Sequence, residues 1–262
     1  MTDYSSLPQK LDFEGPNNFR EMGGYPVGDG KTMAQGRLFR SDHLGHMTEA
    51  DQKLFAELGI KTVVDLRREN EREDILDNIQ APSVNQIWLP VVAEGADVTY
   101  LRRGMEKGTI DAEKAAQYLT RANQGFIDIH AHVFKEFLEI LLDPASYPLV
   151  FHCSAGKDRA GFAAALALWI AGADDETVMH DYLATNHCTA NYLNGLIDGI
   201  ADNPLVQTSP EALRTLMQVR PEYLGAAIDA ANQNYGSIQN FIAQALDITP
   251  EKRAKLQALL CE

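Results

Sequence analysis

Apolar residues occur in two patterns along the chain, as short continuous runs and as longer stretches with helical spacing. The short runs are rich in β-branched or aromatic residues and predict buried strands at Arg37–Arg40, Ile60–Arg67, Gln86–Val91 and Tyr147–His152. Helical stretches separate these runs. This alternation predicts an α/β fold with a central, mainly parallel sheet flanked by helices.

Capping residues mark several helix boundaries. Thr48 is expected to cap a helix that ends at Gly59, and Asp174 to cap a later one. The longest helical pattern runs from about Lys114 to Leu142, with a break expected at Gly125. Three further helices are predicted in the C-terminal third, because a proline stands near the start of each: Pro210, Pro221 and Pro250.

Three segments between these elements are polar or irregular. An Asp29-Gly30 pair predicts a hairpin turn. The charged stretch Glu69–Asn78 is expected to be exposed. Residues 93–113 show no clear period and predict a loop, which together with the start of the next helix would form a mobile lid at about 93–125.

The length of 262 residues and a hydrophobic fraction of 45% suit one large α/β domain. Neither a repeat nor a low-complexity linker divides the chain. We therefore interpret residues 1–262 as a single domain with a helical C-terminal part at about 205–262. The net charge of −14 argues against nucleic acid or an anionic membrane surface as the main partner.

Membrane insertion and secretion find no support in the sequence. The longest apolar stretch, Gly161–Ala173, is too short to cross a bilayer, so no stable membrane insertion is expected. The N-terminal residues do not resemble a signal peptide. Cys153, Cys188 and Cys261 show neither a disulfide framework nor a zinc pattern. We expect a cytoplasmic protein, while export without a signal peptide stays open.

One short sequence, VFHCSAGKDRAG from Val150 to Gly161, combines residue types that suit phosphate chemistry. Cys153 follows a predicted strand, and an apolar helix begins near Arg159. Gly156 allows a sharp turn in which successive N–H groups point inward. The helix adds its positive N-terminal end. The turn is therefore expected to form a bowl for a tetrahedral dianion.

A thiol at the base of this bowl would feel the same field, which favours the thiolate of Cys153. Arg159 could bind two phosphate oxygens with its planar guanidinium group. We predict that Cys153 is an in-line nucleophile and forms a cysteinyl-phosphate that water hydrolyses, without a metal ion or a cofactor. The residues expected to bind the phosphate are Ser154, Ala155, Gly156, Lys157, Asp158 and Arg159.

Asp158 is unexpected in an anion site, because a phosphate dianion would repel its carboxylate. If the neighbouring anion keeps Asp158 protonated, the side chain could donate a proton to the leaving oxygen as a general acid. Alternatively, Asp158 points outward and pairs with Lys157 or another base. Three other acids, all near or within the predicted lid, compete for the role: Glu94, Asp97 and Asp111.

Residues near other strand ends could support the bowl. Asp65 and Arg67 end a buried strand, and the carboxyl ends of strands in such sheets face the ligand site. A structural ion pair is an equally good interpretation of these two residues. Arg40 and Asp42 carry the same two interpretations. His152 is expected to fix the geometry of the loop by hydrogen bonding.

The loop resembles that of the bacterial tyrosine-phosphatase-like lipid phosphatases, which usually reads His-Cys-x-Ala-Gly-Lys-Asp-Arg-Thr-Gly. The resemblance covers nearly the whole chain and implies that Cys153 is the nucleophile, Arg159 the phosphate-binding arginine and Asp158 the acid. Lys157 would contact phosphate oxygens or a second phosphate. Other motifs that carry the resemblance are NFREMGGY (18–25), GRLFRSDHL (36–44), VVDLRRENER (63–72) and PEYLGAAIDAANQNYGS (221–237).

The resemblance implies a protein-tyrosine-phosphatase-like fold with a helical lid. Members of the family act on phosphotyrosine, often on phosphoserine or phosphothreonine, and on phosphoinositides. The chain is thus expected to be a metal-independent phosphomonoesterase of the protein tyrosine or dual-specificity type. Its partners would be a phosphorylated protein or a small phosphomonoester, with inorganic phosphate as product. The net charge of −14 favours phosphoproteins or soluble phosphates over membrane phosphoinositides.

Ala160 departs from the family loop, where a threonine would help the cysteine leave in the second step. This departure keeps a second hypothesis open, a phosphate-binding module with little turnover. A sulfurtransferase or an arsenate reductase could use a similar cysteine loop. The spacing from Cys153 to Arg159 suits phosphate transfer better than the former, and the lack of a nearby resolving cysteine in the sequence argues weakly against the latter.

Overall fold

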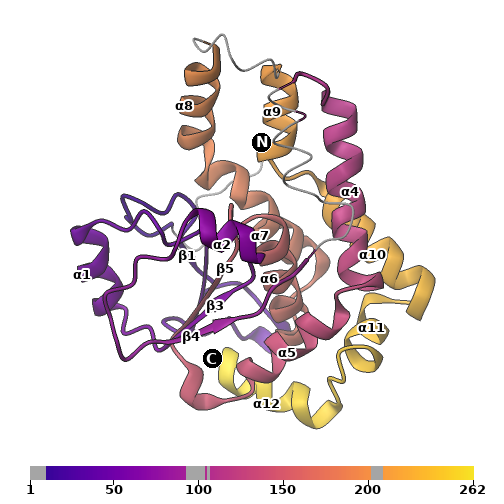
Figure 1. The fold of residues 1–262 in the computed structure, drawn as a ribbon. Coiled ribbons are helices and arrows are strands. Elements are labelled where there is room, and N and C mark those ends of the chain that lie inside the picture. Colours follow the sequence, from indigo (N-terminus) through magenta and orange to yellow (C-terminus); the bar gives the residue numbers. More distant parts are fainter. Residues whose placement is uncertain (1–9, 93–103, 105–106, 202–208) are drawn as a thin grey trace.

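A mainly parallel sheet forms the centre of the fold (Figure 1). The computed structural model describes residues 10–92, 104, 107–201 and 209–262. Within these residues, the strands of the sheet are β1 Arg20–Glu21, β2 Leu38–Ser41, β3 Thr62–Asp65, β4 Asn85–Trp88 and β5 Leu149–His152. Their order in the described sheet is β1-β2-β5-β3-β4. All neighbours pair in parallel except β1, which is antiparallel to β2. This arrangement confirms the sheet predicted from the sequence.

The central strand, β5, ends between the ends of its two neighbours. His152, its last residue, pairs with Ser41 of β2 on one side and with Asp65 of β3 on the other. The segments that follow these three strands therefore leave the sheet at one common edge. In a parallel sheet this carboxyl edge is where ligands bind.

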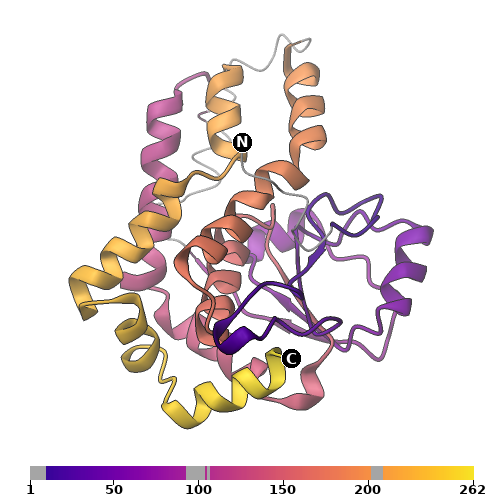
Figure 2. The same ribbon diagram turned by 180° about the vertical axis from the view of Figure 1, so that it is seen from behind.

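Helices cover both faces of the sheet. Helix α6, Asp158–Ala171, lies on the face to which Leu149 and Phe151 of β5 point, and it is buried from Ala160 to its end. Helix α1, Glu49–Glu57, covers the other face, where Val150 of β5 belongs to a smaller apolar cluster. Figures 1 and 2 show α1 and α6 on opposite sides of the sheet.

The remaining described helices are α2 Glu69–Asp74, α4 Ala112–Asp128, α5 Ala131–Leu141, α7 Asp175–Cys188, α8 Ala190–Ala201, α9 Pro210–Met217, α10 Pro221–Tyr235, α11 Ile238–Gln244 and α12 Pro250–Leu260. Helix α4 packs against α9 and α10, and α7 packs against α6. In Figure 1, α8, α9 and the start of α4 extend upward beyond the sheet and its flanking helices.

Several local predictions are confirmed. Thr48 caps α1 in a reciprocal capping box with Asp51. The Asp29-Gly30 pair adopts positive φ angles of 62° and 70°, and a bridge between Pro26 and Thr32 closes the expected hairpin. The three prolines that were expected to start helices occupy the first turns of α9, α10 and α12.

Two helix predictions are wrong in part. Helix α4 continues through Gly125, and the break falls at Ile129 and His130, whose main-chain N–H groups both donate to the carbonyl of Gly125. Five described helices follow α7 rather than three. The additional ones, α8 and α11, do not begin with a proline, and α11 is capped by the side chain of Ser237 instead.

The predicted lid lies only partly within the described part of the chain. Residues 93–103 and 105–106 fall outside it. From residue 112 onward the segment is helix α4, and the mobility of the lid stays a prediction. In the described ranges, no helix combines the length and the apolar character that crossing a membrane requires.

Candidate active site

The chain between β5 and α6 forms a tight loop at the carboxyl edge of the sheet. Cys153 follows β5 directly and is only 2% exposed, and α6 begins at Asp158. At Gly156 φ is +66°, and a Cβ atom there would lie 2.7 Å from Asn18 Nδ2 and from the main-chain nitrogen of Asp42. A side chain at this position would therefore clash, which explains the glycine that the sequence analysis singled out.

Groups outside the loop bind its main-chain carbonyls. Asn18 Nδ2 donates to the carbonyls of Ala155 at 3.2 Å and Gly156 at 3.0 Å. Arg40 Nη2 donates to the carbonyl of Gly156 at 2.7 Å. The carbonyl of Ser154 accepts from a main-chain N–H of the segment after β2. Because the N–H of a trans peptide points away from its C=O, these contacts favour N–H groups that point to the opposite side of the loop.

A buried ion network holds Asn18 and Arg40 in place. Asp181 of α7 pairs with Arg20 and Arg40, and all three side chains are at most 1% exposed. Burial alone would raise the pKa of Asp181, but the charges of the two arginines and a hydrogen bond from Tyr25 lower it overall. Arg20 also donates to Asn18 Oδ1. One carboxylate thereby fixes both side chains that bind the loop carbonyls.

This network bears on Arg40 and Asp42, for which the sequence allowed either support of the loop or a structural ion pair. Arg40 supports the loop directly. The carboxylate of Asp42 accepts from the main-chain N–H groups of Asn17 and Asn18, each at 2.9 Å, and so places the Asn18 side chain. The sequence analysis did not single out Asn18 or Asp181 as residues that support the loop. Asn18 stands within one of the motifs that carry the family resemblance, and no sequence signal marks Asp181.

Arg159, in the first turn of α6, is held by Glu71 of α2. Its Nη1 and Nη2 atoms donate to the two carboxylate oxygens at 2.6 and 2.7 Å. Ser154 Oγ donates to Glu71 Oε1 at 2.5 Å. Burial would raise the pKa of Glu71, but these contacts and the charge of Arg159 lower it to about 2. The ionised carboxylate therefore fixes the guanidinium group beside the loop.

Arg159 also lies close enough to Cys153 for the two side chains to interact electrostatically. Burial alone would lower the pKa of Arg159, but the hydrogen bond with Glu71 and the field of Cys153 raise it overall. The structure thus brings together the cysteine and the arginine that the sequence analysis selected.

The prediction that residues 69–78 form an exposed charged stretch is wrong for two of its acids. The side chains of Glu71 and Asp77 are only 9% and 8% exposed. Glu71 Oε2 accepts from the main-chain N–H of Arg68 at 3.0 Å at the start of α2. Because the N-cap is an arginine and not a serine or threonine, the sequence shows no capping box that would have drawn attention to Glu71.

Arg67 joins two carboxylates below the loop. Its Nη2 lies 2.9 Å from Asp65 Oδ2 and 2.7 Å from Asp77 Oδ2. These distances describe the structural ion pair that was one of the two interpretations of Asp65 and Arg67. Asp65, Asp77 and His152 could in principle surround a cation, since their ligand atoms lie within 4.8 Å of one another. Arg67 already compensates both carboxylates, so the cluster does not favour a metal ion.

Asp158 lies between the lysine of the loop and helix α4. Lys157 Nζ is 2.9 Å from Asp158 Oδ2, and Asn123 Nδ2 donates to Oδ1 at 3.4 Å. The Asp158 side chain is 17% exposed. It therefore makes the predicted pair with Lys157 without pointing outward into solvent. Its role as the acid stays a prediction.

Of the three competing acids, Asp111 alone lies within the described residues. Its side chain caps α4 by accepting from the main-chain N–H of Lys114 at 2.8 Å, and it is 60% exposed. This capping contact gives Asp111 a structural role. Ala160 is fully buried in α6, so a methyl group stands where the resembled family has a hydroxyl.

A cavity of about 300 Å³ adjoins the loop. Ser154 and Ala155 form part of its wall, and His43, His46 and Tyr192 of α8 are among the residues that face them. The cavity therefore combines aromatic and hydrogen-bonding groups beside the loop.

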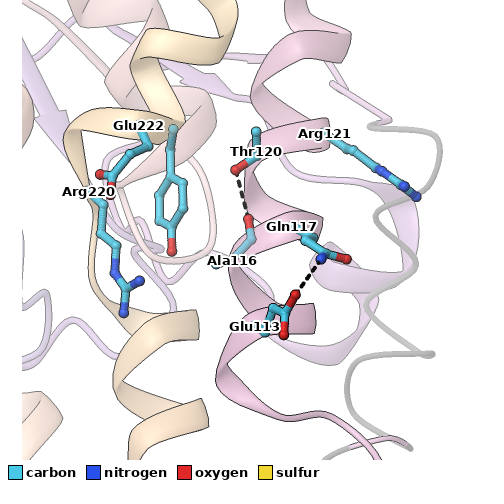
Figure 3. Close-up of a pocket in the computed structure, with 8 residues that line it drawn as sticks. Glu113, Ala116, Gln117, Thr120, Arg121, Arg220 and Glu222 are labelled. Atoms are coloured by element: carbon cyan, nitrogen blue, oxygen red, sulfur yellow. Dashed lines mark hydrogen bonds between the residues drawn. The ribbon is translucent and has the colours of Figure 1, made fainter.

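A second cavity, of about 350 Å³, lies between α4 and α10 (Figure 3). Figure 3 shows Glu113, Gln117 and Arg121 on the α4 wall, and Arg220 and Glu222 at the start of α10. Gln117 Nε2 donates to Glu113 Oε1 at 3.1 Å. This cavity has charges of both signs and therefore does not by itself indicate an anion site.

Comparisons with known proteins agree with this geometry. The chain is 27% identical to a Cupriavidus necator protein named, provisionally, a tyrosine-protein phosphatase, over 91% of this chain and 84% of that protein. It is 28% identical to the triple specificity protein phosphatase PtpB of Mycobacterium tuberculosis, over 89% of this chain and 93% of PtpB. A tyrosine-protein phosphatase of Nostoc commune is 26% identical, over 84% of this chain and 73% of its own length.

Among solved structures, the chain is similar to the core catalytic domain of the PP-IP phosphatase SIW14 from S. cerevisiae. The TM-score is 0.39 at 15% identity, and the match covers 85% of this chain and 96% of that domain. This likeness is too distant to bear on function. The sequence model of the tyrosine phosphatase family matches residues 11–262, which is nearly the whole chain. The chain therefore belongs to the tyrosine phosphatase family.

Proposed function

We propose that this phosphatase is a metal-independent phosphomonoesterase in which Cys153 attacks the phosphorus atom of the substrate. The observation that carries the proposal is the loop after β5, which begins at the buried Cys153 and whose carbonyls are bound from outside. Such contacts leave the loop N–H groups available on the opposite side. Arg159, fixed by Glu71, adds a guanidinium group next to it. Such preorganised donors stabilise the charge of a phosphoryl group during transfer.

The reaction would proceed in two steps. The thiolate of Cys153 forms a bond to phosphorus while the bond to the leaving oxygen breaks, and Asp158 donates a proton to that oxygen. Water then attacks the cysteinyl-phosphate, the phosphorus–sulfur bond breaks, and the carboxylate of Asp158 accepts a proton from the water. The products are the dephosphorylated alcohol or phenol, inorganic phosphate and the regenerated thiolate.

The position of Lys157 suggests how the substrate could engage the loop. Its ammonium group lies 2.9 Å from the carboxylate of Asp158. A phosphate dianion entering the loop would compete with Asp158 for this ammonium group. The Asp158 side chain would then be free to turn towards the leaving oxygen.

The proposed substrates are phosphorylated proteins, with phosphotyrosine as the first class to test. Phosphoserine and phosphothreonine follow, because PtpB, a relative along most of the chain, is named a triple specificity phosphatase. Phosphoinositides rank lower, since a chain with a net charge of −14 is repelled by an anionic membrane surface. A cytoplasmic location fits three cysteines that are all free.

The direct test is hydrolysis of an aryl phosphate by the purified chain in excess chelator. We expect turnover, and we expect Cys153→Ser to abolish it. Retained turnover in this variant would refute the cysteine mechanism. A panel of phosphotyrosine, phosphoserine and phosphothreonine peptides, phosphoinositides and soluble inositol phosphates would then rank the substrates.

A second candidate function is a phosphate-binding module with little turnover. Ala160 is the observation that favours it, because the buried methyl group cannot donate a hydrogen bond to the departing sulfur. Mass spectrometry after mixing with excess aryl phosphate separates the two functions. Stoichiometric phosphorylation of Cys153 without a second turnover would support the module, and continued release of phosphate would support the enzyme.

A further inference from the structure

The ring of His152 lies between the main chain of the nucleophile and a second acid, Asp77. His152 is fully buried at the end of β5. Its Nδ1 atom is 3.3 Å from the carbonyl oxygen of Cys153. Its Nε2 atom is 3.2 Å from Asp77 Oδ2, within ion-pair distance, although the contact does not have hydrogen-bond geometry. The ring therefore lies between Asp77 and the main chain of the proposed nucleophile.

Asp77 is itself rigidly held. Its Oδ1 accepts from the main-chain N–H of Leu44 at 3.0 Å, and its Oδ2 accepts from Arg67 Nη2 at 2.7 Å. Burial would raise the pKa of Asp77, but its contacts with His152 and the charge of Arg67 lower it overall. A fixed, ionised carboxylate thus stands behind the ring.

The other carboxylate near the ring lies farther away. Asp65 Oδ1 is 3.9 Å from His152 Nε2, and the Asp65 oxygens also accept from Arg67 and pair with Arg72 at 3.0 Å. The charge of Arg67 reaches Asp77, and Asp77 in turn contributes to the electrostatic environment of His43. Asp77 is therefore the carboxylate best placed to orient the ring.

We infer that Asp77 is a positioning residue for the nucleophile: its carboxylate orients the His152 ring, and the ring holds the main chain at Cys153. The inference rests on the proposed function, in which Cys153 is the attacking group. Nothing in the reaction steps above requires Asp77, which stands outside the catalytic loop and was predicted to be exposed.

Two possible roles of Asp77 predict effects of opposite sign. If Asp77 acted only as a nearby negative charge, its removal would make the Cys153 thiolate easier to form. If Asp77 acts through His152, its removal frees the ring and loosens the main chain that surrounds the thiolate. The thiolate then loses inward N–H donors and becomes harder to form.

The experiment measures the rate of Cys153 alkylation by iodoacetamide as a function of pH, on the full chain without substrate. Peptide mass spectrometry separates Cys153 from the free Cys188 and Cys261. For Asp77→Asn we expect the midpoint of the alkylation profile to move up by about one pH unit, which is about a tenfold loss of reactive thiolate below the midpoint. A midpoint that moves down or stays in place would overturn the inference.

A double-mutant cycle tests whether the effect passes through the ring. In a His152→Asn background, adding Asp77→Asn should leave the midpoint unchanged. The same upward shift in that background would show that Asp77 acts by another route. Asp65→Asn is the matched control, since it removes an equal charge from the same Arg67 without touching the ring at hydrogen-bond distance, and it should not raise the midpoint.

Asp77→Glu provides a second variant in case Asp77→Asn does not fold. It keeps the charge but moves the carboxylate by about one methylene, so an upward shift of less than one pH unit is expected. An unchanged midpoint in this variant would also count against the inference. Because alkylation needs no turnover, a chain that hydrolyses no phosphomonoester would refute the proposed function while leaving this measurement informative.

Discussion

Replacing Glu71 by glutamine removes a charge from the candidate site with little change in shape. In the native chain, Glu71 accepts two hydrogen bonds from Arg159 and one from Ser154. Glutamine can accept at only one of its two terminal atoms, and its amide group meets the guanidinium group as a second donor. Arg159 would therefore lose a charge-assisted pair and part of its orientation beside Cys153.

The lowered pKa of Glu71 sets an upper limit on how much its ionised carboxylate contributes to the free energy of unfolding. The value falls from 4.5 to about 2, and one pH unit corresponds to about 1.36 kcal/mol, so the ionised carboxylate contributes at most about 3.4 kcal/mol. Partial exposure of the pair and the remaining neutral hydrogen bond reduce the expected loss in Glu71→Gln to about 2 to 3 kcal/mol.

This contribution depends on pH in a defined direction. Because folding lowers the pKa of Glu71, the stabilisation is complete above pH 4.5, the unfolded value, and disappears as the pH falls towards 2. Between pH 7 and pH 3.5 the native chain should lose about 1.4 kcal/mol through this group, whereas Glu71→Gln loses nothing through it. The difference in the free energy of unfolding between the native chain and Glu71→Gln should therefore become smaller at pH 3.5.

Urea unfolding followed by tryptophan fluorescence at pH 7.5, 5 and 3.5 measures this difference. Glu73→Gln is the matched control, since Glu73 is an exposed acid on the same helix. We expect the control to differ little from the native chain at every pH. A stability difference for Glu71→Gln that stayed constant from pH 7.5 to 3.5 would refute the assignment of the stabilisation to the Glu71 charge.

Three other substitutions test separate parts of the site. Asp181→Asn leaves two buried arginines without their carboxylate and should cost about 3 to 5 kcal/mol in urea unfolding, whereas a loss below 1 kcal/mol would show that the network is dispensable. Asp158→Asn should slow alkyl phosphates more than aryl phosphates, because a phenolate needs less protonation; equal slowing would remove Asp158 from the acid role. Ala160→Thr should speed the decay of phosphorylated Cys153 in rapid-quench experiments, and an unchanged decay would show that the missing hydroxyl does not limit turnover.

The loop after β5 could be predicted because its requirements are local. A cysteine after a strand, a glycine at a turn with positive φ, and an arginine in the first turn of a helix are all set by neighbouring residues. Cys153, Gly156 and Arg159 occupy these positions in the structure. The parallel sheet was predictable for the same reason, since short apolar runs separated by helical stretches have few other solutions.

The partners of the loop could not be predicted because they depend on the order of the strands in space. Glu71 is 88 residues from Arg159 in sequence, and Asn18 is 138 residues from Gly156. Glu71 follows β3, and Asn18 precedes β1, which pairs with β2. Both reach the loop because β5 lies between β2 and β3. The sequence pattern predicts the strands but not that β5 lies between β2 and β3. Without this order, a charged segment such as residues 69–78 is expected to be exposed.

The choice of cation beside each acid distinguishes Asp158 from the carboxylates around it. Glu71 pairs with Arg159, and Asp181 pairs with two arginines, so both are locked in an ionised form by planar groups that hold two contacts at once. Asp158 pairs instead with Lys157, a single flexible ammonium group that a phosphate can draw away. A substrate phosphate can therefore displace Lys157 from Asp158 more easily than it can displace the arginines from Glu71 or Asp181, and this difference favours Asp158 as the proton donor.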